Sequence, residues 1–144
     1  MNDQILSLLE RLHGNETATE VFASAAFPST ATDSSWIEVR GFRQVDFLFV
    51  VANQQSVTDL TVYIDHSDDG TRAFPVVVES LDTTATPPQV DQYTYKIVAA
   101  DAFSGTQLHY AVTVPVRGRY MRVSFLGGPS VGTDTVTVFA YRRS

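Results

Sequence analysis

The strongest constraint on the fold is a series of short runs, rich in β-branched and aromatic residues, that begins at Trp36 and continues almost to the end of the 144-residue chain. Apolar and polar side chains alternate along these runs, most clearly at residues 60–65 and 135–140. A period of two is typical of a strand with one buried face. We expect strands at residues 36–40, 44–52, 59–65, 73–79, 92–98, 107–114, 119–126 and 134–142.

Turn-forming residues separate these runs, and no helical period recurs after residue 35. An α/β fold would need helices between its parallel strands. The sequence therefore predicts an all-β fold: an antiparallel β-sandwich that is jelly-roll-like, with about eight strands. The expected turns are Asp68-Asp69-Gly70, Pro87-Pro88, Ser104-Gly105, Arg117-Gly118 and Gly127-Gly128-Pro129.

The first 35 residues follow a different pattern. Residues 4–12 have the apolar spacing of one helical face, which predicts a short amphipathic helix that must rest on another surface. Residues 15–35 are rich in Thr, Ala and Ser, and we interpret them as an extended arm that wraps over a neighbour, with a frayed leader as the alternative. The chain is thus divided into a helix and arm, residues 1–35, and a sandwich domain, residues 36–144. The expected partner-binding residues of the helix and arm are Ile5, Leu8, Leu9, Leu12, Val21, Phe22 and Phe27.

Composition narrows the class of function. The chain is 44% hydrophobic and 18% charged, as expected for one folded domain. Its formal charge of -6 argues against sequence-independent nucleic-acid binding, and without Cys it has neither disulfides nor thiolate metal ligands. The N-terminus lacks a signal-peptide pattern, and the longest apolar stretch, residues 47–52, is too short to span a bilayer. We expect a soluble protein with no cofactor, no nucleic-acid partner and no membrane partner.

The basic residues are unevenly distributed. Nine of the ten are Arg, with Lys96 as the one lysine, and five lie in the last 28 positions. Arg is enriched at protein interfaces and Lys is depleted, so the skew favours a protein-binding surface, with genomic composition bias as the alternative. The expected surface contacts are Tyr93, Tyr95, Arg117, Arg119, Arg142 and Arg143, and Arg122 belongs to the same basic stripe.

The motif closest to a metal site is the acidic segment 65–70, which places oxygen ligands and a Gly as an EF-hand loop does. Its twelfth position is Val76, where the bidentate Glu is required, and its flanks are expected to be strands. We interpret the segment as an acidic hairpin turn, while a calcium site completed by another loop stays open.

No pattern for catalysis is found. His13, His66 and His109 are isolated from one another in the sequence, which also lacks a Gly-x-Ser-x-Gly elbow and a phosphate-binding Gly-rich loop. Two carboxylates brought together by the fold remain a route to a glycosidase site. We expect that the protein is not an enzyme.

Aromatic residues offer one binding alternative, a platform on which sugar rings stack. Core packing explains Trp36 equally well, whereas Tyr93 and Tyr95 share a strand face and would form an interface patch if both were exposed. The residues considered for the platform are Trp36, Tyr63, Tyr93, Tyr95 and Tyr110.

Three segments resemble the β-sandwich domains of tailed-phage virion proteins, which are themselves similar to galactose-binding or discoidin-type jelly rolls. They are an aromatic opening strand at residues 36–42, a strand ending in Ser-x-Asp-Gly at 60–70, and an Arg-Tyr-hydrophobic-Arg-Val strand at 119–125. The resemblance covers about residues 36–142. Cellular discoidin-type lectins usually carry disulfides and exposed loop aromatics, whereas this chain has no Cys and few aromatics in its predicted loops.

The resemblance implies a structural protein of a bacteriophage virion, made in the host cytoplasm. A small domain with a preceding arm is similar to capsid decoration, or cement, proteins, which staple neighbouring capsid subunits. The expected partners are the major capsid protein or another virion protein, and further copies of the chain in a homo-oligomer, with a trimer favoured. A tail, baseplate or head-fibre part is an alternative within this class, and a carbohydrate-binding module or adhesin is the alternative outside it.

Overall fold

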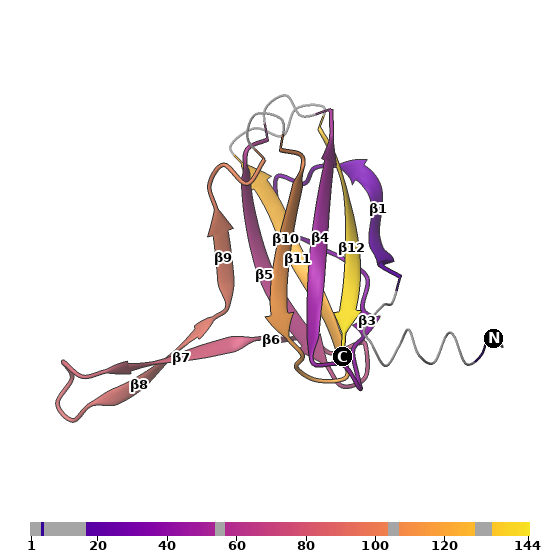
Figure 1. Ribbon diagram of the computed structural model, residues 1–144. Coiled ribbons are helices and arrows are strands. Elements are labelled where there is room, and N and C mark those ends of the chain that lie inside the picture. The colour runs from indigo at the N-terminus through magenta and orange to yellow at the C-terminus, as the bar shows by residue number, and fades with distance from the viewer. Residues whose placement is uncertain (1–3, 5–16, 54–56, 104–106, 129–133) are drawn as a thin grey trace.

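Two antiparallel sheets pack face to face in the computed structural model of the chain (Figure 1). The structure describes residue 4 and residues 17–53, 57–103, 107–128 and 134–144. The first sheet has the strand order β1-β12-β4-β10. Its strands are β1 (Thr19–Ala26), β12 (Thr135–Arg143), β4 (Gln44–Ala52) and β10 (His109–Pro115).

The second sheet is built around two long central strands. Its main path is β2-β11-β5-β6, with β3 also paired to β11 and β9 also paired to β5. The strands are β2 (Thr32–Asp33), β3 (Ile37–Glu38), β11 (Tyr120–Gly128), β5 (Asp59–Ser67), β6 (Phe74–Pro75) and β9 (Lys96–Ala99). The two sheets together form an all-β sandwich, as the sequence predicts.

The core lies between the sheets and follows the alternation seen in the sequence. On β5, Leu60, Val62 and Ile64 are fully buried, while the polar side chains between them lie on the outer face. On β12 the inward residues Val136 and Val138 are buried in the same way. Alternation along these strands therefore predicts correctly which face packs inward.

Phenylalanine rings fill the centre of the core. Phe125 on β11 makes edge-to-face contacts with three rings from other segments, at centroid distances of 5.1 Å to Phe22, 5.3 Å to Phe49 and 6.0 Å to Phe27. Two of these partners, Phe22 and Phe27, precede Trp36 in the chain. The N-terminal segment from residue 17 is thus part of the sandwich core.

This packing corrects the expectation of an extended arm. Residues 19–26 form β1, which pairs with β12, and Val21 and Phe27 are buried in the core. Ser34 and Ser35 are also tied to the body, through backbone hydrogen bonds to Val123 and Val21. The arm interpretation was wrong for residues 17–35. This Thr- and Ala-rich segment is fixed by pairing with β12, a strand more than 100 residues away in the sequence, and local composition does not predict such pairing. The expected helix, with Ile5, Leu8, Leu9 and Leu12, lies outside the described residues.

Strand positions differ from the sequence prediction in three further ways. The run at 73–79 is divided between β6 and β7 (Val77–Asp82), and the run at 92–98 between β8 (Gln89–Thr94) and β9. The described residues form twelve strands, not about eight, because β1 and β2 are added and two runs are split. Gly127 and Gly128, expected in a turn, are the last two residues of β11.

Candidate binding surface: a projecting β-ribbon

One part of the chain leaves the sandwich. Strands β7 and β8 pair only with each other, as a two-stranded sheet that projects sideways from one end of the body (Figure 1). We call residues 77–94 the ribbon. It is inserted between β5 and β9, which are themselves paired within the second sheet.

The ribbon is held at its base by hydrogen bonds to the body. The amide of Val76 donates to the carbonyl of Ile64 at 2.9 Å, and the amide of Tyr95 donates to the carbonyl of Val76 at 2.7 Å. A cavity of about 250 Å³ lies at this junction, lined by residues of the ribbon base and of β5, β10 and β11. The ribbon is therefore joined to the body at its base, and among the described residues β7 and β8 pair with no other strand.

Side chains on the ribbon support the hairpin locally. Gln92 donates a hydrogen bond of 2.9 Å to the carboxylate of Glu79 on the opposite strand. At the turn, Asp82 accepts hydrogen bonds from the hydroxyl and the backbone amide of Thr84, and these lower the pKa of Asp82. A two-stranded hairpin without a packed face is only marginally stable in water. A hairpin that pairs with no other described strand is therefore a candidate surface for a partner.

Exposure supports that conclusion. Leu81 and Val90 lie opposite each other in the register and are 62% and 58% exposed. Among the described residues, large apolar side chains that are at least 40% exposed occur only in the ribbon and in the two strands that connect it to the body: Phe74, Val77, Val78, Leu81, Val90, Tyr93 and Val98. Apolar side chains gathered on one projecting element are typical of a protein-binding surface.

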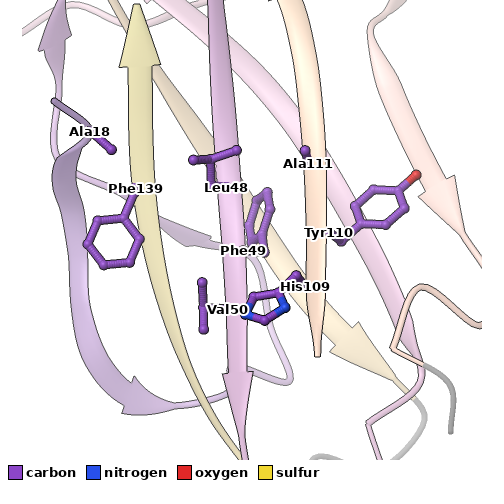
Figure 2. Close-up of a pocket in the computed structure, with 8 residues that line it drawn as sticks. All are labelled: Ala18, Leu48, Phe49, Val50, His109, Tyr110, Ala111 and Phe139. Atoms are coloured by element: carbon purple, nitrogen blue, oxygen red, sulfur yellow. The ribbon is translucent and has the colours of Figure 1, made fainter. Parts of the chain in front are cut away.

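A second apolar surface lies on the outer face of the first sheet. Leu48 and Val50 of β4 point outward there, beside Ala111 of β10 and Phe139 of β12 (Figure 2). They line a depression of about 480 Å³, completed by Ala18, Phe49, His109 and Tyr110. The depression and the ribbon arise from different sheets of the sandwich.

Arginines gather at the end of the first sheet where β12 finishes and β4 begins. The amide of Arg43 donates to the carbonyl of Arg143 at 2.8 Å, and the Arg143 guanidinium pairs with Asp46 at 2.7 Å. Arg119 and Arg142 both reach Glu38, one through its carboxylate and one through its backbone carbonyl. We call this surface the arginine end: Arg40, Arg43, Arg119, Arg142 and Arg143. Three of the five basic residues in the last 28 positions lie here, while Arg117 lines the cavity at the ribbon base.

Arg122 belongs to neither of these surfaces. It lies on the outer face of the second sheet, where its guanidinium pairs with Asp65 at 3.1 Å and with Asp33 at 3.4 Å. It also stacks over the Trp36 ring at 4.4 Å. Tyr63, on the same face of β5 as Asp65, has the Lys96 ammonium 5.7 Å from its ring centroid. Two of the five aromatic residues considered for sugar stacking, Trp36 and Tyr63, therefore already have a cation of the same chain over their rings.

The acidic segment 65–70 forms a tight loop whose carboxylates have specific partners. Asp69 accepts hydrogen bonds from the amides of Arg72 and Thr71, at 2.9 and 2.8 Å, and from the hydroxyl of Ser67. These bonds hold the pKa of Asp69 well below its usual value of 3.8. Gly70 ends the loop with φ of 73°, a conformation that favours glycine. Asp69 therefore stabilises the loop by accepting hydrogen bonds from the backbone amides of Thr71 and Arg72.

Other candidates from the sequence are dispersed over the fold. His66 lies beside Phe74 at the ribbon base, with a ring centroid distance of 5.9 Å, and His109 lies at the rim of the depression. His13 is outside the described residues. Across the ranges that the structure describes, no group of three or more His, Asp or Glu side chains is placed to hold a metal ion. In the same ranges no helix is both long and apolar enough to cross a membrane.

Tyr93 and Tyr95 do not form the shared patch that their spacing suggests. Tyr93 is in the ribbon and exposed, whereas Tyr95 follows the end of β8 and packs against the core cluster. The chain leaves the ribbon at this point, so the two rings belong to different surroundings. Of the expected tyrosine contacts, only Tyr93 lies on the projecting surface.

Comparison with known proteins finds no family model that matches the chain and no curated protein that matches it.

Sequence reasoning missed the ribbon because its two strands resemble any others in composition. Apolar residues occupy consecutive positions at Val76-Val77-Val78 and therefore both faces of a strand. Strand β4 of the sandwich shares this feature, since Phe47 and Phe49 are buried while Leu48 and Val50 face outward. The pattern alone therefore does not distinguish the ribbon from a strand of the body.

Proposed function

We propose that the protein is a structural component of a bacteriophage virion, a decoration protein that binds the capsid lattice and stabilises it, and that its ribbon is the element that binds the neighbouring protein. The observation that carries the binding role is the concentration of exposed apolar side chains on the ribbon. Burial of such side chains against a partner supplies most of the free energy of a protein interface. The protein works in the assembled virion, after synthesis in the host cytoplasm.

The strand order supports the jelly-roll part of the resemblance. When β2 and β3 are counted as one strand and the insertion β6–β8 is left aside, the eight strands follow the order 1-8-3-6 in one sheet and 2-7-4-5 in the other. This is the order of two interlocked Greek keys. The ribbon is then an insertion into the connection between the fourth and fifth strands, and insertions on a rigid scaffold are where function is commonly added.

The carbohydrate-binding alternative has weaker support. Trp36 lies under the Arg122 guanidinium and Tyr63 lies beside the Lys96 ammonium, so neither ring is a bare stacking platform. Asp69 is occupied by backbone amides of its own loop. A glycan array that gives specific binding, lost with Tyr63→Ala, would favour this alternative over the structural role.

The proposal is tested on phage particles that encode this chain. We expect the protein to co-purify with particles through a density gradient, and added protein to bind particles that lack it. The double substitution Leu81→Asp with Val90→Asp should abolish binding, because it places charge in the apolar contact while replacing side chains that are already exposed.

The matched control is Ser29→Asp with Thr30→Asp, which adds the same charge to an exposed loop of the body. This control should bind particles as the unmodified protein does. Absence of the protein from purified particles, or full binding by the ribbon variant, would contradict the proposal.

A further inference from the structure

We propose that the ribbon of one copy docks on the outer face of the β1-β12-β4-β10 sheet of a second copy, with its apolar residues in the depression and its carboxylates toward the arginine end. The inference rests on the proposed function in one respect: it names which neighbour the ribbon binds. The other neighbours, a different virion protein or residues 1–16 of the chain, are outcomes of the test below.

The geometry of a single copy separates the two surfaces. The ribbon is attached through β6, which pairs with β5 in the second sheet, whereas the depression lies on the outer face of the first sheet. Figure 1 shows the ribbon extending away from the body, so its tip lies far from that face. One copy therefore presents both surfaces at once and joins them only through another copy.

The two surfaces are both apolar. Leu81 and Val90 are cross-strand neighbours and form an apolar pair near the turn, while Val77 lies on the same face but is separated from them by the Glu79–Gln92 pair. The depression presents Leu48 and Val50 (Figure 2) as an apolar floor across the face of the sheet. Sheets that pack face to face lie about 10 Å apart and bury such side chains between them.

The charges of the two surfaces are complementary. Residues 77–94 contain three carboxylates, Glu79, Asp82 and Asp91, and no Lys or Arg. The sheet that carries the depression ends at Arg143, which lies opposite Gln44 in the register. Along β4, Gln44 is two residues from Asp46 and four from Leu48 of the depression. At the arginine end Arg40 and Arg119 pair with Glu38 and Arg143 pairs with Asp46, so its five guanidinium groups outnumber these two carboxylates. An acidic ribbon laid along β4 and β12 would meet this excess of positive charge, which favours one orientation of docking.

In a contact between two different surfaces, each copy can place its ribbon on one neighbour and accept the ribbon of another neighbour in its depression. Such a head-to-tail contact closes into a ring if the rotation between copies allows it, and otherwise extends as an open chain. The trimer that the resemblance to capsid decoration proteins implies is one such ring. Pairing between two ribbons would instead use the same surface on both copies, and this difference can be measured.

The test is the mass of the purified full chain, measured by analytical ultracentrifugation. We expect the unmodified protein to be oligomeric, and two variants to be monomeric: Leu81→Asp with Val90→Asp, which damages the ribbon, and Ala111→Asp, which puts a carboxylate in the depression. Ala111 is exposed, so its substitution leaves the fold intact. The control Ser29→Asp with Thr30→Asp should keep the oligomer.

A mixture of the two monomeric variants gives the decisive result. One copy of each variant together supply one intact ribbon, from Ala111→Asp, and one intact depression, from the ribbon variant. An equimolar mixture should therefore form dimers and nothing larger. A mixture that stays monomeric, an Ala111→Asp protein that keeps the full oligomer, or an unmodified protein that is monomeric at all concentrations would overturn the inference. If the unmodified protein is monomeric and the ribbon variant still loses particle binding, the proposed function survives and the second copy is rejected as partner.

Discussion

Strand β11 and strand β7 are both antiparallel strands with apolar side chains, yet they lie in opposite surroundings. β11 is paired on both sides, with β5 on one and β2 and β3 on the other, and its Phe125 is fully buried. β7 is paired with β8 alone, and its Leu81 is 62% exposed. The comparison teaches that an apolar strand pattern predicts burial against some surface, without saying whether that surface belongs to the same chain.

The two strands should also contribute differently to stability. Apolar area removed from water in the folded chain stabilises that chain, so Phe125 contributes to its free energy of unfolding. The side chains of the ribbon remain in water in the single chain and contribute only when a partner covers them. Stability is thus expected to depend on the sandwich, and assembly on the ribbon.

The largest expected effect is at the centre of the core. Phe125→Ala removes a ring that contacts Phe22, Phe27 and Phe49, and we expect a loss of about 3–5 kcal/mol in the free energy of unfolding. Leu81→Ala should change it by less than about 0.5 kcal/mol in the monomer. Urea denaturation followed by Trp36 fluorescence measures both. Equal losses for the two variants would remove the distinction between the body and the ribbon.

A smaller effect is expected where the N-terminal segment packs into the body. A Cβ added to Gly127 would lie 2.6 Å from Cε1 of the Phe27 ring, which is itself buried. Gly127→Ala should therefore destabilise the fold by about 1–3 kcal/mol. Gly128→Ala is the matched control, because nothing lies within 4 Å of its added Cβ. A neutral Gly127→Ala would mean that Phe27 is not fixed in the core and that residues 17–35 are an arm after all.

The smallest effect is expected in the acidic loop. The pKa of Asp69 is lowered, so the stabilisation from its hydrogen bonds is fully present above the ordinary value of 3.8 and is lost as the pH falls through the lower folded value. Asp69→Ala at neutral pH should speed hydrogen exchange at the amides of Thr71 and Arg72 and leave exchange in β11 unchanged. Unaltered exchange at those two amides would show that the loop does not depend on this carboxylate.

Much of the sandwich could be predicted from the sequence because its strands alternate regularly. The predicted strand at residues 44–52 has the bounds of β4, and the inward faces of β5 and β12 are as expected. β1 was missed because Thr19 and residues 23–26 are small or polar, and their position is fixed by pairing with β12. Local patterns do not contain that long-range partner.

The binding surface was less accessible to sequence reasoning. The arginine end joins residues from position 40 to position 143, which only the strand register brings together. The depression likewise combines side chains of β4, β10 and β12 whose outward direction could be inferred, but whose grouping could not. The ribbon was divided between two predicted strands, since nothing in residues 73–79 or 92–98 says that the chain leaves the body there.

Cross-linking tests the central claim most directly, because the chain has no Cys and single thiols can be placed at will. Thr83→Cys near the ribbon tip and His109→Cys at the rim of the depression are prepared separately, mixed and treated with a short bis-maleimide. The account predicts a cross-linked species that contains one copy of each variant, and none when Ser29→Cys replaces His109→Cys. Cross-links between Thr83→Cys copies alone, or equal yields with both partners, would contradict it.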